Sequence, residues 1–318
     1  ITQSYDVSPL VAKLLSIRNV NYQDIQSYIK PSLKNSIPDP STLTDMDTAC
    51  ERLFKAIFDE ERISIFGDYD VDGSTSTSIL VNYFKQISID LDFHIPDRFT
   101  EGYGPSINSF SKFKSKNTNV IITVDCGTMA HSEIAFANQK GMDVIVLDHH
   151  LPEIKLPEAK AIINPNRIDD ISGLNYLAAV GVTFMLIVGL NRKLRKEGWF
   201  EKKLIKEPNL IELLDLVALG TIWDAVPLKG INRILVSKGI DVIHKRLNPG
   251  LNSLIEVSKI KSKVSVYDLG FKIGPRINAG GRLGYSSFGT ELLTESNKQK
   301  IDTLSKNLDK FNCIDLPI

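Results

Sequence analysis

Residues 63–72 read Ile-Ser-Ile-Phe-Gly-Asp-Tyr-Asp-Val-Asp, an apolar run followed by carboxylates at every second position. The apolar run favours a buried strand, and in extended backbone alternate side chains project to one side. Three carboxylates in one small space repel each other unless a cation lies among them, and oxygen ligands suit a hard divalent cation. Gly67 and Gly73 flank the acidic run and are expected to let the backbone turn tightly. The stretch therefore predicts a metal site at a strand end.

Further candidate ligands follow other apolar runs. Asp148, His149 and His150 end one such run, Asp125 closes another, and Asp224 follows an apolar helical segment. Any one of these aspartates alone is more simply a helix cap or turn residue. The set is different, because several carboxylates at strand ends are costly without cations. Carboxylates with one or two imidazoles favour Mn²⁺ or Mg²⁺, and two such ions can activate a water and stabilise a phosphate.

The chain from residue 46 alternates between apolar and amphipathic segments. We expect strands at 62–67, 90–95, 119–125, 143–148 and 160–163, with helices near 46–59, 73–87, 106–114 and 129–140. This pattern predicts an α/β fold with a mostly parallel sheet flanked by helices. Ligands of such sheets bind beyond the carboxyl ends of the strands, which is where the candidate residues fall.

Three parts are expected along the chain: a helical extension at 1–45, the sheet domain at 46–230, and a helical part at 231–318. The last part is expected to end in one long helix over 288–312. The basic segment 191–206, with Trp and Phe between its lysines and arginines, either lines a substrate channel or forms a solvated helix face. The solvated face is the favoured interpretation.

Composition excludes some classes of protein. The 318 residues carry 38 basic and 38 acidic side chains, so bulk charge does not indicate nucleic acid, although a local basic surface would suffice. Three scattered cysteines and no CxxC pair exclude a disulfide framework and a thiolate zinc site, and they favour a reducing cytoplasm. No apolar stretch is long enough to span a bilayer. Because the chain begins with Ile1, we expect a fragment or a processed form.

The acidic clusters resemble the motifs of a known superfamily. Gly67–Gly73, Val124–Gly127, Asp148–His150 and Gly220–Asp224 resemble motifs one to four of the DHH phosphoesterases. Gly274–Leu283 resembles a bacterial exonuclease family within it that degrades single-stranded DNA from the 5′ end. The resemblance covers essentially the whole chain. It implies two Mn²⁺ or Mg²⁺ ions, phosphodiester hydrolysis that releases mononucleotides in DNA repair and recombination, and single-stranded DNA, single-strand-binding protein and repair helicases as partners, with no membrane.

The resemblance also implies roles for individual residues. The positions that match metal ligands are Asp70, Asp72, Asp125, His149 and Asp224, with Asp125 bridging two ions. The positions that match supporting, catalytic and substrate-phosphate groups are Asp68, Asp148, His150, Arg276, Asn278 and Arg282. Because the two histidines are adjacent, we expect one to be a ligand and the other to face the scissile phosphate. A helix-end salt bridge is an equally weighted alternative for the two arginines.

Two features depart from the family pattern. The family continues into a second domain, DHHA1, with a Gly-Gly-His motif, and the exonucleases add an oligonucleotide-binding barrel. No Gly-Gly-His occurs in this chain, because the Gly-Gly at 280–281 is followed by Arg282. We therefore expect the chain to stop in the connector helix, before the second domain, with impaired catalysis. Trp223 stands where a small residue is usual, and its bulk either narrows the pocket or packs against it.

Other members of the superfamily are alternatives. A manganese inorganic pyrophosphatase would have His where this chain has Phe66, which argues against that assignment. A phosphodiesterase of small or cyclic oligonucleotides would need the second domain. An inactive binding or scaffold fragment is the alternative from another class, and the intact set of ligands argues against it.

Overall fold

The computed structural model describes residues 1–315. Its centre is a five-stranded parallel sheet of order β2-β1-β3-β4-β5. The strands are β1 (Ile63–Gly67), β2 (Asp92–His94), β3 (Val120–Val124), β4 (Asp143–Leu147) and β5 (Ala161–Ile163). The predicted α/β class and parallel sheet are confirmed, and each strand lies within its predicted range.

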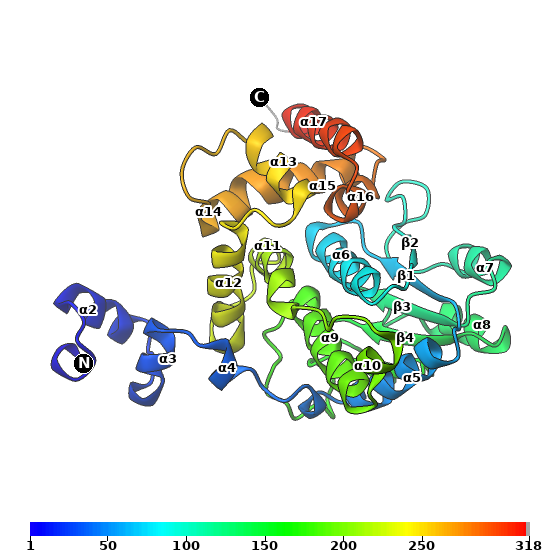
Figure 1. Ribbon diagram of the computed structural model, residues 1–318, viewed down its shortest axis with the longest axis horizontal. Coiled ribbons are helices and arrows are strands. Elements are labelled where there is room, and N and C mark those ends of the chain that lie inside the picture. Colours follow the sequence, from blue (N-terminus) through cyan, green and yellow to red (C-terminus); the bar gives the residue numbers. More distant parts are fainter. Residues whose placement is uncertain (316–318) are drawn as a thin grey trace.

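Helices cover both faces of the sheet (Figure 1). One face packs against α7 (Ile107–Ser115) and α8 (His131–Gln139), and the other packs against α5 (Met46–Phe58), α6 (Val71–Gln86) and α9 (Ala179–Lys196). The helix α11 (Leu214–Trp223) packs on α6 and α9. Alternate residues of a strand point to opposite faces, so Ile122 joins the α6 side and Ile121 the α8 side. Both faces are therefore buried, which explains the near-continuous apolar strands.

The N-terminal part forms short helices that extend away from the sheet in Figure 1. They are α1 (Thr2–Tyr5), α2 (Pro9–Ile17), α3 (Ile25–Ile29) and α4 (Leu33–Ser36). The α4 helix contacts α12 (Gly230–Ile243). Between residues 1 and 315 no helix combines the length and the apolar character needed to cross a membrane.

The C-terminal part packs over α6 and α11. It comprises α12, α13 (Pro249–Val257), α14 (Val266–Asp268), a π-helical turn η4 (Leu269–Ile273), α15 (Gly274–Arg282), α16 (Phe288–Thr294) and α17 (Lys298–Asp315). The apolar core on this side of the sheet continues into Leu292 and Leu308. The predicted boundary at residue 231 stays a prediction.

The single long helix predicted over 288–312 is wrong, because α16 and α17 are separate helices. The carboxylate of Glu295 accepts hydrogen bonds from the backbone N–H groups of Ser296 (2.8 Å) and Asn297 (2.9 Å). Asn297 Oδ1 then accepts from the N–H groups of Gln299 and Lys300 at the start of α17. These side chains satisfy the backbone groups that a continuous helix would have paired, so the chain turns here.

The basic segment 191–206 forms the end of α9 and the short helix α10 (Trp199–Lys203). Trp199 and Phe200 are buried, so neither ring is available to stack on a base. Arg192 pairs with Asp39 at 2.7 Å. The segment begins about two-thirds of the way along α9, which has 18 residues and is about 27 Å long. The N-terminus of α9, at the opposite end of the helix, contacts Asp72 of the acidic run. The structure therefore favours the solvated helix face over the channel wall.

Candidate metal centre

The acidic run lies on the turn from β1 into α6 and not in extended backbone, which corrects our expectation. The α6 helix begins at Val71, so Asp70 is its N-cap, and Asp70 Oδ1 accepts a hydrogen bond from the N–H of Gly73 at 3.0 Å. Asp72 lies in the first turn. Carboxylates are favoured at both positions because the first N–H groups of a helix lack partners and its dipole is positive there. The three carboxylates thus surround a helix N-terminus.

Gly67 and Gly73 allow close packing and not a tight backbone turn, because neither has a positive φ. A Cβ atom on Gly73 would lie 2.5 Å from the carbonyl oxygen of Asp68. A Cβ atom on Gly67 would lie 2.1 Å from Oγ1 of Thr77. Glycine at both positions lets α6 start directly against the end of β1.

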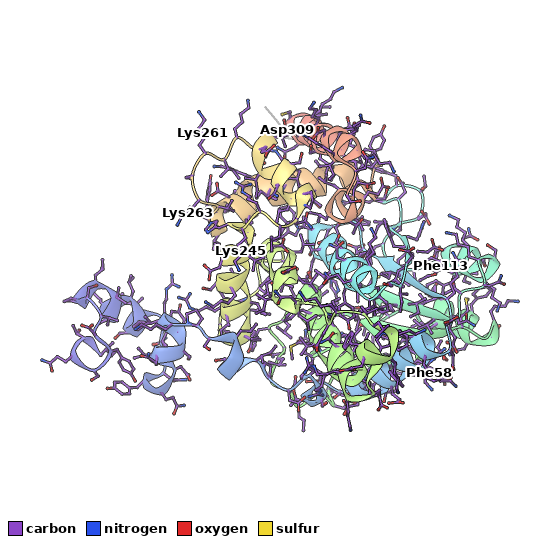
Figure 2. The ribbon with its side chains drawn as sticks, viewed as in Figure 1. Phe58, Phe113, Lys245, Lys261, Lys263 and Asp309 are labelled. Atoms are coloured by element: carbon purple, nitrogen blue, oxygen red, sulfur yellow. The ribbon has the colours of Figure 1, made fainter. Side chains whose placement is uncertain are left out.

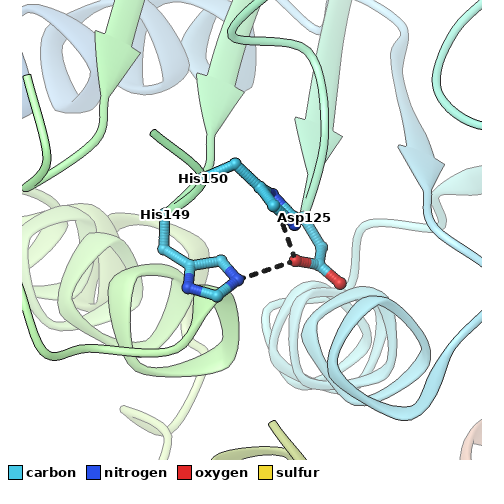
Figure 3. A group of neighbouring side chains, drawn as sticks. All are labelled: Asp125, His149 and His150. Atoms are coloured by element: carbon cyan, nitrogen blue, oxygen red, sulfur yellow. Dashed lines mark ion pairs between the residues drawn. The ribbon is translucent and has the colours of Figure 1, made fainter. Parts of the chain in front are cut away.

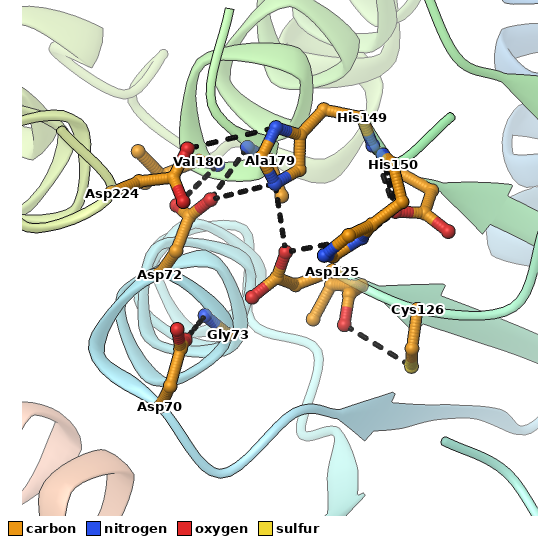
Figure 4. Close-up of polar contacts among 12 residues, drawn as sticks. Asp70, Asp72, Gly73, Asp125, Cys126, His149, His150, Ala179, Val180 and Asp224 are labelled. Carbon is orange, nitrogen blue, oxygen red and sulfur yellow. Dashed lines mark hydrogen bonds and ion pairs between the residues drawn. The ribbon is translucent and has the colours of Figure 1, made fainter. Parts of the chain in front are cut away.

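Asp72 is held by the N-terminus of α9. Its side chain is fully buried, Oδ2 accepts from the N–H of Ala179 (2.7 Å) and Oδ1 from the N–H of Val180 (2.9 Å). The positive end of an 18-residue helix stabilises the carboxylate. These two contacts fix the orientation of Asp72 toward the centre (Figure 4).

Asp125 follows β3, and one of its carboxylate oxygens faces both histidines (Figure 3). Its Oδ1 is 3.3 Å from Nε2 of His149 and 4.0 Å from Nδ1 of His150. Both rings face one oxygen, which two adjacent side chains of an extended strand could not do. They follow the end of β4, so the alternation of side chains in a strand no longer applies. Asp125 itself has φ 61°, a left-handed conformation that costs about 1 kcal/mol or more in a residue with a Cβ.

His149 joins Asp125 to two further carboxylates. Its Nε2 is 3.8 Å from Oδ2 of Asp72, and its Nδ1 is 3.6 Å from Oδ2 of Asp224, which follows the end of α11. Four segments that are distant in the sequence thus meet at one edge of the sheet (Figure 4). Three overlapping groups place ligand atoms within 4.8 Å of one another: Asp125-His149-His150, Asp72-His149-Asp224 and Asp68-Asp70-Asp125.

Asp148 orients the histidine pair. Its Oδ1 accepts from Nδ1 of His150 (2.7 Å) and from the backbone N–H groups of His149 (2.8 Å) and His150 (3.2 Å). Its Oδ2 accepts from the N–H (3.1 Å) and the hydroxyl (2.7 Å) of Thr128. Burial alone would raise the pKa of Asp148, but the hydrogen bonds, led by that from His150, lower it. Because both oxygens are engaged, Asp148 positions its neighbours.

Three residues contact this centre without having been assigned a role from the sequence. Asn164 donates to the carbonyl oxygen of His150 (2.8 Å), and Asn166 donates to that of His149. Tyr103 donates its hydroxyl proton to the carbonyl oxygen of Asp125 (3.1 Å). Asn164 and Asn166 follow the end of β5. Their position as polar residues after an apolar run could have identified them as residues at the same edge of the sheet. Tyr103 comes from a loop, where no strand end marks it, and only the family resemblance of residues 101–104 pointed to it.

The electrostatics of the cluster fit bound cations. Burial and then the charge of Asp70 raise the pKa values of Asp68 and Asp224 to about 7. Burial and neighbouring carboxylates raise the pKa values of Asp72 and Asp125 well above their ordinary range. Buried oxygens of Asp68 and Asp125 have no hydrogen-bond partner among the described residues. Buried carboxylate oxygens that accept no hydrogen bond, together with two imidazoles, are a donor set suited to Mn²⁺ or Mg²⁺.

The arginines predicted to contact substrate differ in their environment. Arg276 donates Nε to Oδ1 of Asp309 on α17 (2.8 Å) and Nη1 to the carbonyl oxygen of Lys272 (2.6 Å). For Arg276 the salt-bridge alternative is therefore what the structure shows. With its amide oxygen turned toward Arg282, Asn278 accepts from Nε of that arginine at 3.1 Å.

Close contacts at two glycines hold α15 beside the centre. A Cβ on Gly281 would lie 3.1 Å from the carbonyl oxygen of Tyr69, so the exposed side chain of Arg282 starts next to the acidic run. A Cβ on Gly274 would lie 2.3 Å from Cε3 of Trp223. The bulk of Trp223 thus packs on α15.

The parallel sheet with this acidic edge defines a DHH-family protein. Residues 62–221 match the DHH family, N-terminal domain, and the chain belongs to that family. The predicted superfamily is thereby confirmed.

The chain is similar to the single-stranded-DNA-specific exonuclease RecJ. It is 40% identical to RecJ of Salmonella typhimurium over 310 residues, which are 96% of this chain and 53% of that protein. It is 34% identical to RecJ of Bacillus subtilis over 313 residues, which are 98% of this chain and 38% of that protein. The chain spans about half the length, or less, of these relatives.

Solved structures agree. RecJ of Thermus thermophilus in complex with Mn²⁺ superposes with a TM-score of 0.80 and 28% identity, covering 99% of this chain and 43% of that chain. An exonuclease RecJ bound to manganese superposes with a TM-score of 0.74 and 32% identity, covering 86% of this chain and 66% of that chain. The fold of this chain is thus that of these RecJ structures, both of which hold manganese.

Proposed function

We propose that the protein is a metal-dependent hydrolase that removes mononucleotides from the 5′ end of single-stranded DNA. The observation that carries the proposal is the buried cluster of carboxylates around His149, with oxygens of Asp68 and Asp125 that accept no hydrogen bond among the described residues. Its similarity to RecJ supplies the substrate class. When bound, two divalent cations lower the pKa of a water and neutralise charge on phosphate oxygens.

The protein residues divide the work of holding these cations. Asp72, His149 and Asp224 form one group of possible ligands, and Asp68, Asp70 and Asp125 form another. Asp125 would be the residue shared by both cations, because its Oδ1 also lies 3.3 Å from Nε2 of His149 in the first group. Asp68 is then a direct ligand and not only a supporting residue.

His150 is proposed to face the scissile phosphate. Its Nδ1 is held by Asp148 at 2.7 Å, so Nε2 is the ring nitrogen left for substrate, and about half of the side chain is exposed. A hydrogen bond from Nε2 to the leaving oxygen would stabilise the charge that develops there. Arg282, with Asn278 fixing its guanidinium, is proposed to bind a substrate phosphate beside Tyr69.

The proposal extends to the cellular setting. An exonuclease for single strands acts in DNA repair and recombination in the cytoplasm, where single-strand-binding protein and repair helicases are its proposed protein partners. Affinity capture on each purified partner, with and without single-stranded DNA, would test these contacts.

A substrate panel tests the activity. With Mn²⁺, we expect mononucleotides from 5′-labelled single-stranded DNA and no product from duplex DNA, pyrophosphate or a cyclic dinucleotide. EDTA abolishes the reaction. Asp125→Asn lowers the rate about a hundredfold or more, whereas Asp90→Asn on the exposed surface leaves it unchanged. Pyrophosphate turnover without DNA degradation would transfer the assignment to the pyrophosphatases. Mn²⁺ binding with no turnover of any substrate would leave a metal-binding protein without this activity.

A further inference from the structure

An aromatic pair is exposed on the segment that leads into α15. Tyr267 is 61% and Phe271 70% exposed, and the two rings stack with centroids 4.9 Å apart at 26°. The opposite face of the same segment is buried through Leu269 and Ile273. The pair is therefore not needed for the core, and two large rings remain in contact with water.

Lysines adjoin this pair. Lys259, Lys261 and Lys263 lie on the exposed connection between α13 and α14, and Figure 2 shows the last two pointing outward from it. Among residues 1–315 none of these three lysines forms an ion pair. The acid of the segment, Asp268, is neutralised by Lys272 at 2.7 Å. The surface made by Lys259, Lys261, Lys263, Tyr267 and Phe271, here the 259–271 surface, is therefore cationic and aromatic.

The segment that carries the aromatic pair packs against the end of α11, next to the candidate metal centre. A Cβ on Gly270 would lie 3.5 Å from Cγ2 of Ile222, and Gly274 packs on Trp223. Trp223 directly precedes Asp224, a candidate ligand. The aromatic pair and the lysines therefore belong to a segment whose buried face packs beside the candidate ligand Asp224.

We propose that the 259–271 surface binds the single strand outside the metal centre. A base extends the Tyr267–Phe271 stack, and the lysines contact backbone phosphates. Stacking on aromatic rings beside cations is the general way of binding single strands without reading their sequence, because every base has a π-face. The inference rests on the proposed function for its substrate class, and it assigns a second contact region to that substrate.

Strand binding without cleavage tests the inference. In EDTA, the affinity of the whole chain for a fluorescent 20-nucleotide strand is measured by anisotropy at several salt concentrations. Replacing Tyr267 and Phe271 together by serine weakens binding about tenfold or more. Replacing Lys261 and Lys263 together by glutamine lowers the slope of log affinity against log salt by about 1.4, since each single-strand phosphate contact contributes about 0.7.

Matched controls separate the site from general effects. Phe58→Ser removes an equally exposed ring on α5, and a Lys112→Gln and Lys114→Gln double variant removes two exposed lysines on α7; both bind as the wild type does. With Mn²⁺, the variants of the 259–271 surface lower hydrolysis of the 20-nucleotide strand more than hydrolysis of a dinucleotide, which offers fewer bases and phosphates to that surface.

The outcomes distinguish this inference from the proposed function. Wild-type binding by both surface variants would overturn the inference, even if the 20-nucleotide strand is cleaved normally. Weakened binding in a protein that cleaves no strand would support the inference and remove the hydrolase proposal. A concentration-dependent dimer that the Tyr267 and Phe271 variant abolishes, with unchanged DNA affinity, would overturn it in favour of a second copy as the occupant.

Discussion

Replacing Asp148 by alanine probes how the histidine pair is held. Five hydrogen bonds converge on this buried carboxylate, and three of them come from the backbone N–H groups of Thr128, His149 and His150. Alanine at position 148 leaves these three N–H groups without an acceptor. The Asp148→Ala variant therefore tests how much the hydrogen bonds to this carboxylate stabilise the backbone around the histidine pair.

The expected loss follows from the groups left unpaired. A buried donor without a partner costs about 1–3 kcal/mol, and three at the lower end of that range give a destabilisation of about 3 kcal/mol. Water that enters the space reduces the penalty, whereas the cavity adds to it. Asp148→Asn keeps one acceptor oxygen for the histidine backbone but turns an amide toward the N–H of Thr128. We therefore expect about half the loss for this variant.

Urea unfolding followed by circular dichroism measures the difference. The experiment is done in EDTA, so that weakened metal binding does not contribute to the result. Asp90→Ala, on the exposed surface, is the control and is expected to stay within about 0.5 kcal/mol of the wild type. An Asp148→Ala variant whose free energy of unfolding lies within about 1 kcal/mol of the wild type would refute the reasoning. It would mean that the histidine backbone has other acceptors or reaches solvent.

Three further predictions concern other parts of the molecule. Burial raises the pKa of Asp215 from 3.8 to about 7, so between these pH values the native state keeps a proton that the unfolded chain has lost, and stability falls as the pH rises. The Asp215→Asn variant lacks this loss, so we expect it to be more stable than the wild type at pH 8 by up to about 4 kcal/mol. At pH 4 the gain in the free energy of unfolding should be much smaller. Equal gains at both pH values, measured by urea unfolding, would contradict the argument. Mn²⁺ at a hundredfold excess over its Kd should raise the free energy of unfolding by about 2.7 kcal/mol, seen as a higher Tm, and an equal rise in Asp125→Asn would count against that ligand. Gly274→Ala forces a methyl group against Trp223 and should cost about 1–3 kcal/mol in thermal unfolding, whereas Gly270→Ala, with its nearest contact at an ordinary 3.5 Å, should cost clearly less.

Strand positions followed from the sequence because their causes are local. The strand predicted over 62–67 is Ile63–Gly67, and that over 160–163 is Ala161–Ile163. An apolar run of a few residues bounded by polar ones is enough to indicate a buried strand of a parallel sheet. The start of α6 was placed two residues too late, because the acidic residues were interpreted as ligands in extended backbone and not also as helix caps.

Helix ends in the C-terminal part were harder to predict. The apolar spacing of 288–312 is helical throughout, so periodicity alone predicts one helix. The break depends on which backbone groups Glu295 and Asn297 accept from. Either side chain could equally point to solvent in a continuous helix, so only the folded chain decides between the two arrangements.

The residues of the metal centre were identifiable from the sequence, but their contacts were not. Carboxylates and imidazoles after apolar runs indicate a shared edge of a sheet, because parallel strands end on the same side. That Asp72 is held by the N-terminus of α9, more than a hundred residues later, depends on how the helices pack. The same is true of Arg276, whose partner Asp309 comes from α17.

The sequence by itself therefore determined the class of fold, the strands and the set of candidate ligands, since each depends on a few neighbouring residues. Only the tertiary structure decided that both histidines face Asp125, that Asp148 is saturated with hydrogen bonds, and that Asp68 keeps an oxygen unpaired within the described part of the chain. The physical reason is that a hydrogen bond or an ion pair requires a distance of a few ångströms, and packing of distant segments sets that distance.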